Sequence, residues 1–560
     1  MTCPAKADAT SRAGMIAAPD RRAAEAGVAM MRRGGNAVDA AVAAAFAIGV
    51  VEPQMSGLGG GTWLVAGLRD RQRYVVVQAP ITTPLAAAPD MFRLADPPRQ
   101  ASLYGWPAVE GDENFLGPRS VGVPGTVAGL CAAQSQLGRL RLRDVITPAI
   151  ELAADGIEVN WFTSAAIVQE ARQLARDPGC SALFLPGGFP LRPPSLTPGD
   201  RLCQPALAET LNSIAEQGSD VFYRGRVGAA IVDYVRSGGG ILTTEDLASY
   251  RPVIHETPLE GTFHGARIVG TRRTGTSTVL QILNLFDIAS REAERAENEA
   301  VAWAQAMRLA HEDRMRWMTA DPDVDVPWKA LLSHRYAADL WQAHAAGEPR
   351  PNPVTHDGEQ SNRDRPDLSE PARWGCTSHI SAVDREGNVV SLTQTILDSF
   401  GARFLEPHTG VLLNDGMTYF DPRPGARNGI KAGTPGMPAV SPVIVEDKRR
   451  GPIAAVGGAG GRKIISSTAQ LIPSLVRGAS AQEAIDAPRI HADAESALVD
   501  NRWPPSVIQD LHRAGFRTEV VSEDPTSWHF ARMGAVTIDN DGIRHGGVDR
   551  HKPGAVACVE

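Results

Sequence analysis

The stretch Trp374-Gly375-Cys376-Thr377-Ser378-His379-Ile380-Ser381-Ala382-Val383-Asp384 decides the fold of this 560-residue chain. From Thr377 onward, small or polar side chains alternate with apolar ones, which is the pattern of a β-strand. A turn follows at Asp384-Arg385-Glu386-Gly387-Asn388, and a second strand pattern runs from Val389 to Thr395. The sequence therefore predicts a β-hairpin.

Thr377 begins the first predicted strand, and a hydroxyl side chain at that place suits one chemistry. If the chain is cut before Thr377, its Oγ1 becomes a nucleophile and its freed α-amine becomes the base. The local pattern is equally that of an ordinary strand residue. A cut one residue earlier makes Cys376 the nucleophile instead.

Composition narrows the class of protein. The chain is 43% hydrophobic and 21% charged, so we expect a globular protein with a large core. A net charge of −8 without a basic block argues against a nucleic-acid partner. The six cysteines form no CxxC pair and no metal spacing, so we expect free thiols, a reducing compartment, no metal and no cofactor.

Two segments bear on the membrane and on location. Residues Met1 to Arg12 are polar and lack an apolar signal core. The longest apolar run, Ala40 to Val51, is too short to span a bilayer and indicates a buried helix. We therefore expect no membrane association and a cytoplasmic protein, unless a signal segment was removed.

Periodicity and capping residues outline the remaining elements. A helix begins after Asp20 and ends at Gly34-Gly35, and a glycine run at 57–61 precedes a strand at 62–66. Further helices are predicted at 37–48, 142–155, 163–176, 206–217, 227–237, 279–318, 464–476 and 481–487. Further strands are predicted near 257–269 and at 443–445, 453–456 and 535–538. Strands around a helical middle predict a layered α+β fold.

Residues 344–376 differ from the rest of the chain. They hold five prolines and many charges but little apolar content, which predicts an exposed, mobile linker. This linker ends at the candidate cleavage point before Thr377.

Several blocks in a consistent order resemble the γ-glutamyltranspeptidase family of N-terminal nucleophile hydrolases. They are Gly34-Gly35-Asn36-Ala37-Val38-Asp39-Ala40-Ala41 with Gly57-Leu58-Gly59-Gly60-Gly61, Val123-Pro124-Gly125-Thr126, Asp220-Val221-Phe222-Tyr223-Arg224-Gly225 with 239–247, Asp321-Pro322-Asp323 with 326–328, the Thr377 stretch, and Gly457-Gly458-Ala459-Gly460-Gly461 with 462–465.

The resemblance implies a four-layer αββα sandwich and an inactive precursor that cuts itself between Cys376 and Thr377. Segments 1–376 and 377–560 are then two chains of one processed precursor, which stay together in one αββα domain. A homo-oligomer of that unit is possible. The family register favours Thr377 over Cys376 as the nucleophile.

The same resemblance assigns catalytic roles. Thr395 matches the family threonine that hydrogen-bonds the nucleophile, and Gly460-Gly461 match the backbone donors that hold an oxyanion. A phosphate loop is excluded for this glycine run, because Gly461 is followed by Arg462-Lys463 rather than by Lys and Ser or Thr. His379 shares a strand face with Thr377, but we interpret it as structural because the α-amine already supplies the base.

The groups that hold a glutamate head group in the family are replaced here. The matching positions are Pro80 for an arginine, Leu397 for an asparagine, Tyr419 for an acidic residue, and Pro438 and Ala439 for paired serines. A site without these groups holds a zwitterion poorly, so we expect an acyl group other than γ-glutamyl.

Candidate substrate contacts are few. Leu397, Asn414 and Tyr419 are candidates by position, and Arg403 and Arg423 are candidates for pairing a substrate carboxylate. Each arginine is equally compatible with a structural role.

The sequence thus predicts a self-processing N-terminal threonine amidohydrolase that acts on a small-molecule amide through a threonyl ester. It resembles the family's divergent members, such as oxamate amidohydrolase and cephalosporin acylases. A γ-glutamyl hydrolase or transferase with a rebuilt pocket is the alternative enzyme, and a non-catalytic scaffold of the same fold is the alternative from another class.

Overall fold

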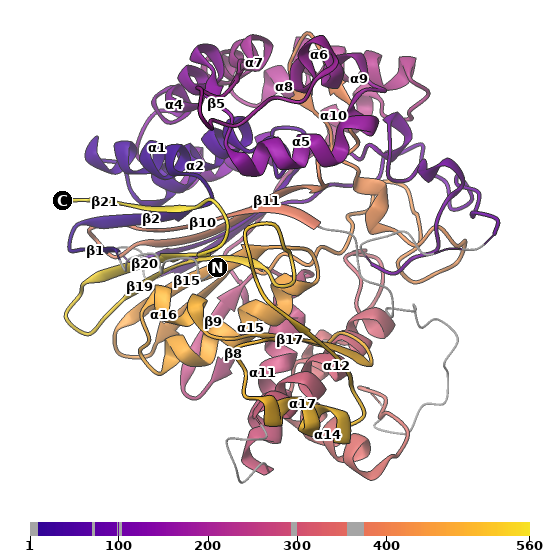
Figure 1. Ribbon diagram of the computed structural model, residues 1–560, viewed down its shortest axis with the longest axis vertical. Helices are drawn as coiled ribbons and strands as arrows, with labels where there is room; N and C mark the ends of the chain where they lie inside the picture. The colour runs from indigo at the N-terminus through magenta and orange to yellow at the C-terminus, as the bar shows by residue number, and fades with distance from the viewer. Residues whose placement is uncertain (1–8, 70–72, 98, 100–103, 293–298, 355–374) are drawn as a thin grey trace.

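Two seven-stranded antiparallel sheets lie face to face between two layers of helices (Figure 1). The computed structural model describes residues 9–69, 73–97, 99, 104–292, 299–354 and 375–560. In spatial order the first sheet contains β21 (Ala555–Val559), β2 (Gly14–Ala18), β10 (Gly375–Val383), β11 (Val389–Asp398), β3 (Gly61–Leu68), β4 (Arg73–Ala79) and β7 (Val253–His255). The second contains β1 (Ala9–Ser11), β20 (Arg544–Val548), β19 (Arg532–Ile538), β15 (Gly451–Ala459), β14 (Val443–Asp447), β9 (Ala266–Gly270) and β8 (Leu259–Phe263).

Helices cover the outer face of each sheet. The first sheet carries α1 (Arg21–Arg32), α2 (Ala37–Val51), α3 (Thr126–Leu137) and α4 (Leu142–Asp155), directly or through α2. The second carries α11 (Gly275–Glu292), α12 (Glu299–Trp317), α15 (Lys463–Val476) and α16 (Ala481–Asp486), directly or through α11. The predicted four-layer αββα sandwich of α+β class is confirmed.

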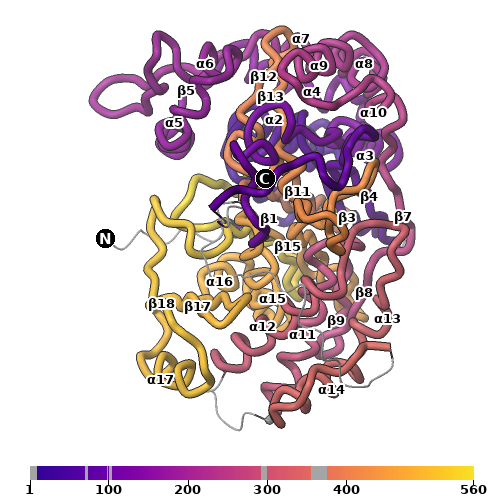
Figure 2. Tube along the Cα trace, turned by 90° about the vertical axis from the view of Figure 1, so that its right-hand side faces the viewer, coloured from indigo at the N-terminus to yellow at the C-terminus, as the bar shows by residue number. Residues whose placement is uncertain are grey.

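The remaining elements are shorter or lie outside this core (Figure 2). The helices are α5 (Trp161–Leu174), α6 (Pro178–Phe184), α7 (Pro205–Gln217), α8 (Asp220–Tyr223), α9 (Arg226–Ser237), α10 (Thr244–Ser249), α13 (Trp328–Leu331), α14 (His334–Ala346) and α17 (Pro505–Arg513). The short strands are β5 (Ile157–Glu158), β6 (Arg201–Leu202), β12 (Leu405–Glu406), β13 (Val411–Leu412), β16 (Ile490–His491), β17 (Ser496–Asp500) and β18 (Arg517–Val521).

Helix α2 supports the central hairpin from outside. It is alanine-rich and buried almost throughout, and its first turn is closed by a capping box between Asn36 and Asp39. Small side chains let the helix lie close to β10 and β11, which it contacts. Among the described residues, none of the helices is long and apolar enough to cross a membrane.

The predicted hairpin is confirmed as β10 and β11, the third and fourth strands of the first sheet. One face points to α2, where Gln394 Nε2 donates to the Ala45 carbonyl (2.9 Å). The other face points to the second sheet, where Ser391 Oγ donates to the Val456 carbonyl (3.1 Å). The sheets approach closely here, because a Cβ at Gly457 would lie only 2.4 Å from His379 Cε1.

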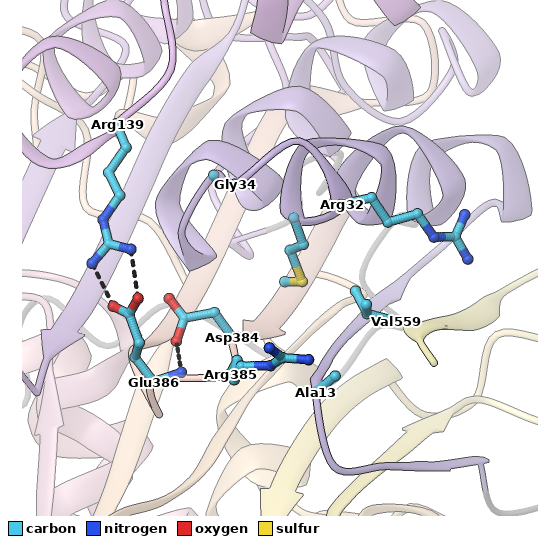
Figure 3. Close-up of a pocket in the computed structure, with 10 residues that line it drawn as sticks. Ala13, Arg32, Gly34, Arg139, Asp384, Arg385, Glu386 and Val559 are labelled. Atoms are coloured by element: carbon cyan, nitrogen blue, oxygen red, sulfur yellow. Dashed lines mark hydrogen bonds and ion pairs between the residues drawn. The ribbon is translucent and has the colours of Figure 1, made fainter.

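The turn of the hairpin is fixed to the helical layer (Figure 3). Asp384 accepts a hydrogen bond from the Ala37 backbone N–H (2.9 Å), and Glu386 forms an ion pair with Arg139. Arg139, Asp384 and Glu386 border a cavity of about 370 Å³ at the end of β10 opposite Thr377. The turn is thereby held in place, which orients the whole strand.

Each sheet contains strands from both sides of the Cys376–Thr377 bond. In the first sheet β2 lies between β21 and β10, and β11 pairs with β3. In the second sheet β1 pairs with β20, and β9 pairs with β14. Of the predicted linker 344–376, residues 355–374 lie outside the described part, while its ends include the last turn of α14 and the start of β10.

Candidate active site

Thr377 lies at an irregularity in the hairpin. The register of β10 against β11 shifts between Cys376 and Ser378, so Thr377 lies opposite a bulge formed by Thr395 and Ile396 of β11. Bulges disrupt the regular ladder and are common beside active sites. Thr377 is only 4% exposed, and its hydroxyl lies within hydrogen-bond reach of the bulged strand.

Thr395 connects the candidate nucleophile to the bond that would be cut. Thr377 Oγ1 lies 3.3 Å from Thr395 Oγ1, within hydrogen-bond reach. The Thr395 hydroxyl donates to the carbonyl oxygen of Cys376, and accepts from the backbone N–H of Leu397 (2.8 Å). The Thr395 hydroxyl therefore contacts both the candidate nucleophile, Thr377 Oγ1, and the Cys376 carbonyl that Thr377 would attack.

The segment after Thr395 has an unusual backbone. Leu397 (φ 84°), Phe400 (φ 57°) and Arg403 (φ 51°) all adopt positive φ, which non-glycine residues rarely do. Such strained positions cluster at functional sites.

The glycine turn joins β15 to α15 and has free donors. Gly460 (φ 135°) and Gly461 (φ 61°) adopt backbone angles that favour glycine. Within the described residues neither N–H donates a hydrogen bond, and Gly461 is buried. Buried N–H groups without an acceptor are rare in proteins, so this pair is available to an oxyanion.

The turn lies near the cleavage point and is firmly held. Ala459, just before it, packs in one apolar cluster with Cys376, Met55 and Phe162. Arg462, just after it, forms a buried ion pair with Asp493 (3.2 Å). The glycine turn therefore lies in the same region of the molecule as Thr377 and Thr395, whereas the catalytic roles of these residues stay predictions.

His379 and Cys376 show no sign of a catalytic role. His379 lies between Thr393 Oγ1 (2.8 Å from Nδ1) and Ser381 Oγ (2.9 Å from Nε2), and burial lowers its pKa to about 3. Burial raises the pKa of the Cys376 thiol well above its usual value, which disfavours the nucleophilic thiolate.

The positions of the replaced head-group contacts are apolar. Leu397 and Tyr419 belong to one buried cluster with Tyr104 and Trp106. The ring centroids of Tyr104 and Tyr419 are 5.7 Å apart, and Trp106 Nε1 donates to the Tyr419 carbonyl (3.3 Å). None of these four side chains carries a charge that would hold an ammonium group.

Asn414 is engaged in positioning the backbone. Its Nδ2 donates to the carbonyls of Gly59 (2.6 Å) and Gly122 (3.0 Å). Its Oδ1 accepts from the N–H groups of Gly122 (2.9 Å) and Gly416 (2.8 Å). With four hydrogen bonds made inside the protein, its amide has little capacity left for substrate.

The two arginine candidates already have carboxylate partners. Arg403 is buried, contacts Glu170 (3.1 Å) and Asp398 (3.5 Å), and stacks over the Phe115 ring. Arg423 forms an ion pair with Asp421 (2.6 Å). A role for either arginine in binding a substrate carboxylate stays a prediction, and these ion pairs weigh against it.

Sequence reasoning missed residues that act from a distance along the chain. Tyr104 and Trp106 reach Tyr419 from a segment without a motif. Arg314 of α12 donates to the carbonyls of Met437 (3.0 Å) and Pro438 (2.9 Å) and so fixes that loop, and burial lowers its pKa to about 10. No local pattern distinguishes these residues from ordinary core positions.

In the described ranges, His, Cys, Asp and Glu side chains form no group of three or more that could hold a metal ion. The absence of a cofactor stays a prediction.

Comparison with known proteins gives consistent results. The family model described as gamma-glutamyltranspeptidase matches residues 23–559. The chain is 35% identical to the acylase ACY 1 proenzyme of Pseudomonas sp. (strain V22) over 537 residues, which cover 92% of this chain and 89% of the relative. It is 31% identical to the glutathione hydrolase proenzyme of Bacillus subtilis (strain 168) over 562 residues, which cover 98% and 91%. The solved cephalosporin acylase of Bacillus halodurans superposes with a TM-score of 0.82 at 25% identity, covering 100% of this chain and 98% of that one.

Proposed function

Because the chain belongs to the γ-glutamyltranspeptidase family, we propose that it is a self-processing N-terminal threonine amidohydrolase for a small-molecule amide. The observation that carries the proposal is the Thr395 hydroxyl, which contacts both Thr377 Oγ1 and the Cys376 carbonyl. The relatives named as an acylase and as a glutathione hydrolase support amide chemistry on this scaffold.

The first reaction is the maturation cut. Thr377 Oγ1 attacks the carbonyl carbon of Cys376, and the hydrogen bond from Thr395 stabilises the negative charge that develops on the oxygen. The C–N bond breaks, the nitrogen takes a proton and becomes the α-amine of Thr377, and an ester joins the two segments. Water then hydrolyses the ester to leave segments 1–376 and 377–560.

The second reaction uses the product of the first. The α-amine of Thr377 accepts the hydroxyl proton while Oγ1 attacks the substrate amide. The N–H groups of Gly460 and Gly461 hold the oxyanion, the amine departs with a proton, and the acyl group stays on Thr377 as an ester. Water releases the acid and restores the hydroxyl.

A γ-glutamyl hydrolase or transferase remains the second candidate, because one of the relatives is named as a glutathione hydrolase. Against it, Pro80, Leu397, Tyr419, Pro438 and Ala439 replace the polar family groups. We therefore favour a different acyl group. A cytoplasmic location and assembly of the two-segment unit into oligomers stay predictions.

Denaturing gels and intact masses of the wild type and Thr377→Ala test the proposal. The wild type should give two pieces, the second beginning at Thr377, and the variant should stay whole. Incubation with amide substrates should add an acyl mass to the 377–560 piece only. A wild-type chain that stays intact and takes up no acyl group would instead support a scaffold, and a piece beginning at Cys376 would move the nucleophile. Rapid turnover of γ-glutamyl-p-nitroanilide would favour the second candidate.

A further inference from the structure

A pocket of about 520 Å³ lies on the same face of the first sheet as the candidate nucleophile. Its floor includes Trp63 of β3 and Gln78 of β4, and Val253 of β7 extends this row to the rim. The three residues are directly paired across three neighbouring strands. Trp63 is also paired with Thr393 of β11. Directly paired residues share a face of a sheet, so this floor continues the face that Thr393 presents toward His379.

The pocket is within reach of an acyl group on Thr377. Thr395 is paired with Gly61, and Trp63 Cη2 lies 3.1 Å from the place of a Cβ on Gly61, so the indole ring lies against that glycine. Neighbouring strands are separated by ~4.8 Å, which puts β3 about 10 Å from β10. Spanning that distance takes a long acyl group, either an extended alkyl chain or a chain that carries an aromatic ring.

Apolar side chains dominate the walls of the pocket. They are contributed by Pro80, Val123, Tyr250, Ala320, Pro435 and Pro438. At the rim, Leu85 and Val253 are 49% and 46% exposed, which is unusual for large apolar side chains. Exposed apolar side chains that border a concavity are typical of a ligand site.

Several polar side chains of the pocket already have partners inside the protein. Gln78 Nε2 donates to the Arg272 carbonyl (2.9 Å), whereas its buried Oε1 has no partner among the described residues. Arg251, Arg272 and Arg273 each donate to a backbone carbonyl, at 2.8, 3.0 and 2.7 Å. Asp246 accepts from the backbone N–H of Leu85 (2.6 Å), and the Tyr250 hydroxyl donates to the Pro80 carbonyl (2.6 Å). An apolar ligand therefore breaks none of these hydrogen bonds when it binds.

The position of the pocket relates it to the acyl half of the substrate. Pro80 and Pro438 line it, and both stand where family members have polar groups for the glutamate acyl donor. Gly436 lines it too, and a Cβ there would lie 2.4 Å from Tyr419. The pocket thus adjoins Tyr419, which belongs to the buried cluster that also contains Tyr104 and Leu397.

Resting on the proposed function, we infer that this pocket binds the acyl half of the substrate and selects a bulky apolar acyl group of aryl or long alkyl type. The acyl group lies along β3 and β4, and the departing amine lies away from Trp63. A methylene added to a group in an apolar pocket is worth roughly 10- to 200-fold in specificity, so selection between acyl groups should be steep.

The test uses p-nitroanilides that differ only in the acyl group: acetyl, γ-glutamyl and 4-phenylbutyryl. With the mature wild type, kcat/KM should be about 100-fold higher for 4-phenylbutyryl than for acetyl. Val253→Trp and Ala320→Phe fill the pocket from the rim and from the wall. Each should reduce this ratio about tenfold and leave the acetyl substrate within about twofold of wild type.

Val520→Trp is the matched control, because Val520 is 53% exposed but lies on β18, outside the pocket. It should change neither value. Intact mass then follows the hydrolysis of the 4-phenylbutyryl ester on Thr377. The amine has left before this step, so the rate of the step reports on binding of the acyl group alone. Val253→Trp and Ala320→Phe should alter the rate of ester hydrolysis if the pocket binds the acyl group. If the pocket binds the amine instead, both variants should leave this rate unchanged.

Three results overturn the inference. The first is a higher kcat/KM for the γ-glutamyl or the acetyl substrate than for the 4-phenylbutyryl substrate. The second is a ratio of 4-phenylbutyryl to acetyl kcat/KM that stays at the wild-type value in both Val253→Trp and Ala320→Phe. The third is an ester decay rate that is unchanged in these variants while their kcat/KM depends differently on the departing amine. These results count only for protein that gives two pieces on a gel. A chain that never matures and never carries an acyl mass refutes the proposed function instead.

Discussion

Removal of the Thr395 hydroxyl should block maturation far more than it harms folding. Thr395→Val keeps the shape of the side chain but removes the donor to the Cys376 carbonyl and the contact with Thr377 Oγ1. Loss of one donor to a developing oxyanion costs roughly 100- to 1000-fold in rate, or about 2.7–4 kcal/mol. The backbone N–H of Leu397 also loses its acceptor, which costs about 1–3 kcal/mol of folding stability.

Thr393→Val is the control that separates these effects. Thr393 lies two residues earlier on the same face of β11, and its hydroxyl bonds to His379 Nδ1 (2.8 Å) rather than to the cleavage site. Its removal leaves a buried group unpaired and should cost similar stability. It should leave the rate of the cut within a few-fold of wild type.

The assay is a time course of chain cleavage after synthesis in a cell-free system, followed on denaturing gels. Urea unfolding of each uncleaved chain on a Thr377→Ala background gives the stabilities. Thr395→Ser, which keeps the hydroxyl, should recover most of the rate. The reasoning is refuted if Thr395→Val cuts within threefold of wild type, or if Thr393→Val slows the cut equally.

Three other perturbations test other features. Burial and the neighbouring Asp398 raise the pKa of Asp415 to about 7 in the folded state, whereas an unfolded Asp has a pKa of about 3.9. The bound proton therefore stabilises the folded state, fully below about pH 3.9. This stability is lost as the pH rises through about 7. Asp415→Asn should therefore bring the urea midpoints at about pH 5 and about pH 8 closer together than in wild type, and an unchanged difference would contradict the assignment. Gly457→Ala places a Cβ 2.4 Å from the His379 ring and should cost about 1–3 kcal/mol in urea unfolding, whereas Gly534→Ala, 3.6 Å from the same ring, should cost much less. The acid limb of kcat/KM for the mature protein should follow the α-amine of Thr377, near pH 7.7–8, and a limb far below pH 7 would argue for another base.

Local patterns predicted the elements whose cause is local. The helix after Asp20 begins where the Asp20 side chain accepts from the Arg22 N–H, and the hairpin follows its alternating pattern and its turn residues. The glycines at 460–461 were correctly placed between a strand and a helix. In each case the determining contacts lie within a few residues of one another.

The environment of the candidate site could not be predicted in the same way. Tyr104, Trp106 and Arg314 act on Tyr419, Met437 and Pro438. These partners lie more than a hundred residues away along the chain, and only packing brings them together. The pairing of Trp63, Gln78 and Val253 across three strands is likewise a property of sheet order. Sequence periodicity indicates which face of a strand is buried, but it does not indicate which strand lies beside it in the sheet.

The interleaving of strands from the two sides of Cys376 has a consequence for the life of the mature protein. Cleavage converts one chain into two, but neither sheet loses a strand, so the folded product should keep its shape and hold both pieces for as long as it stays folded. After complete unfolding the situation differs, because two separate chains must meet again before either sheet can form. Recovery of the cut protein should therefore slow on dilution, whereas the uncut Thr377→Ala chain should refold at a rate independent of concentration. The proposed cut would thus make the folded state one that forms readily from a single chain and is difficult to form again from two.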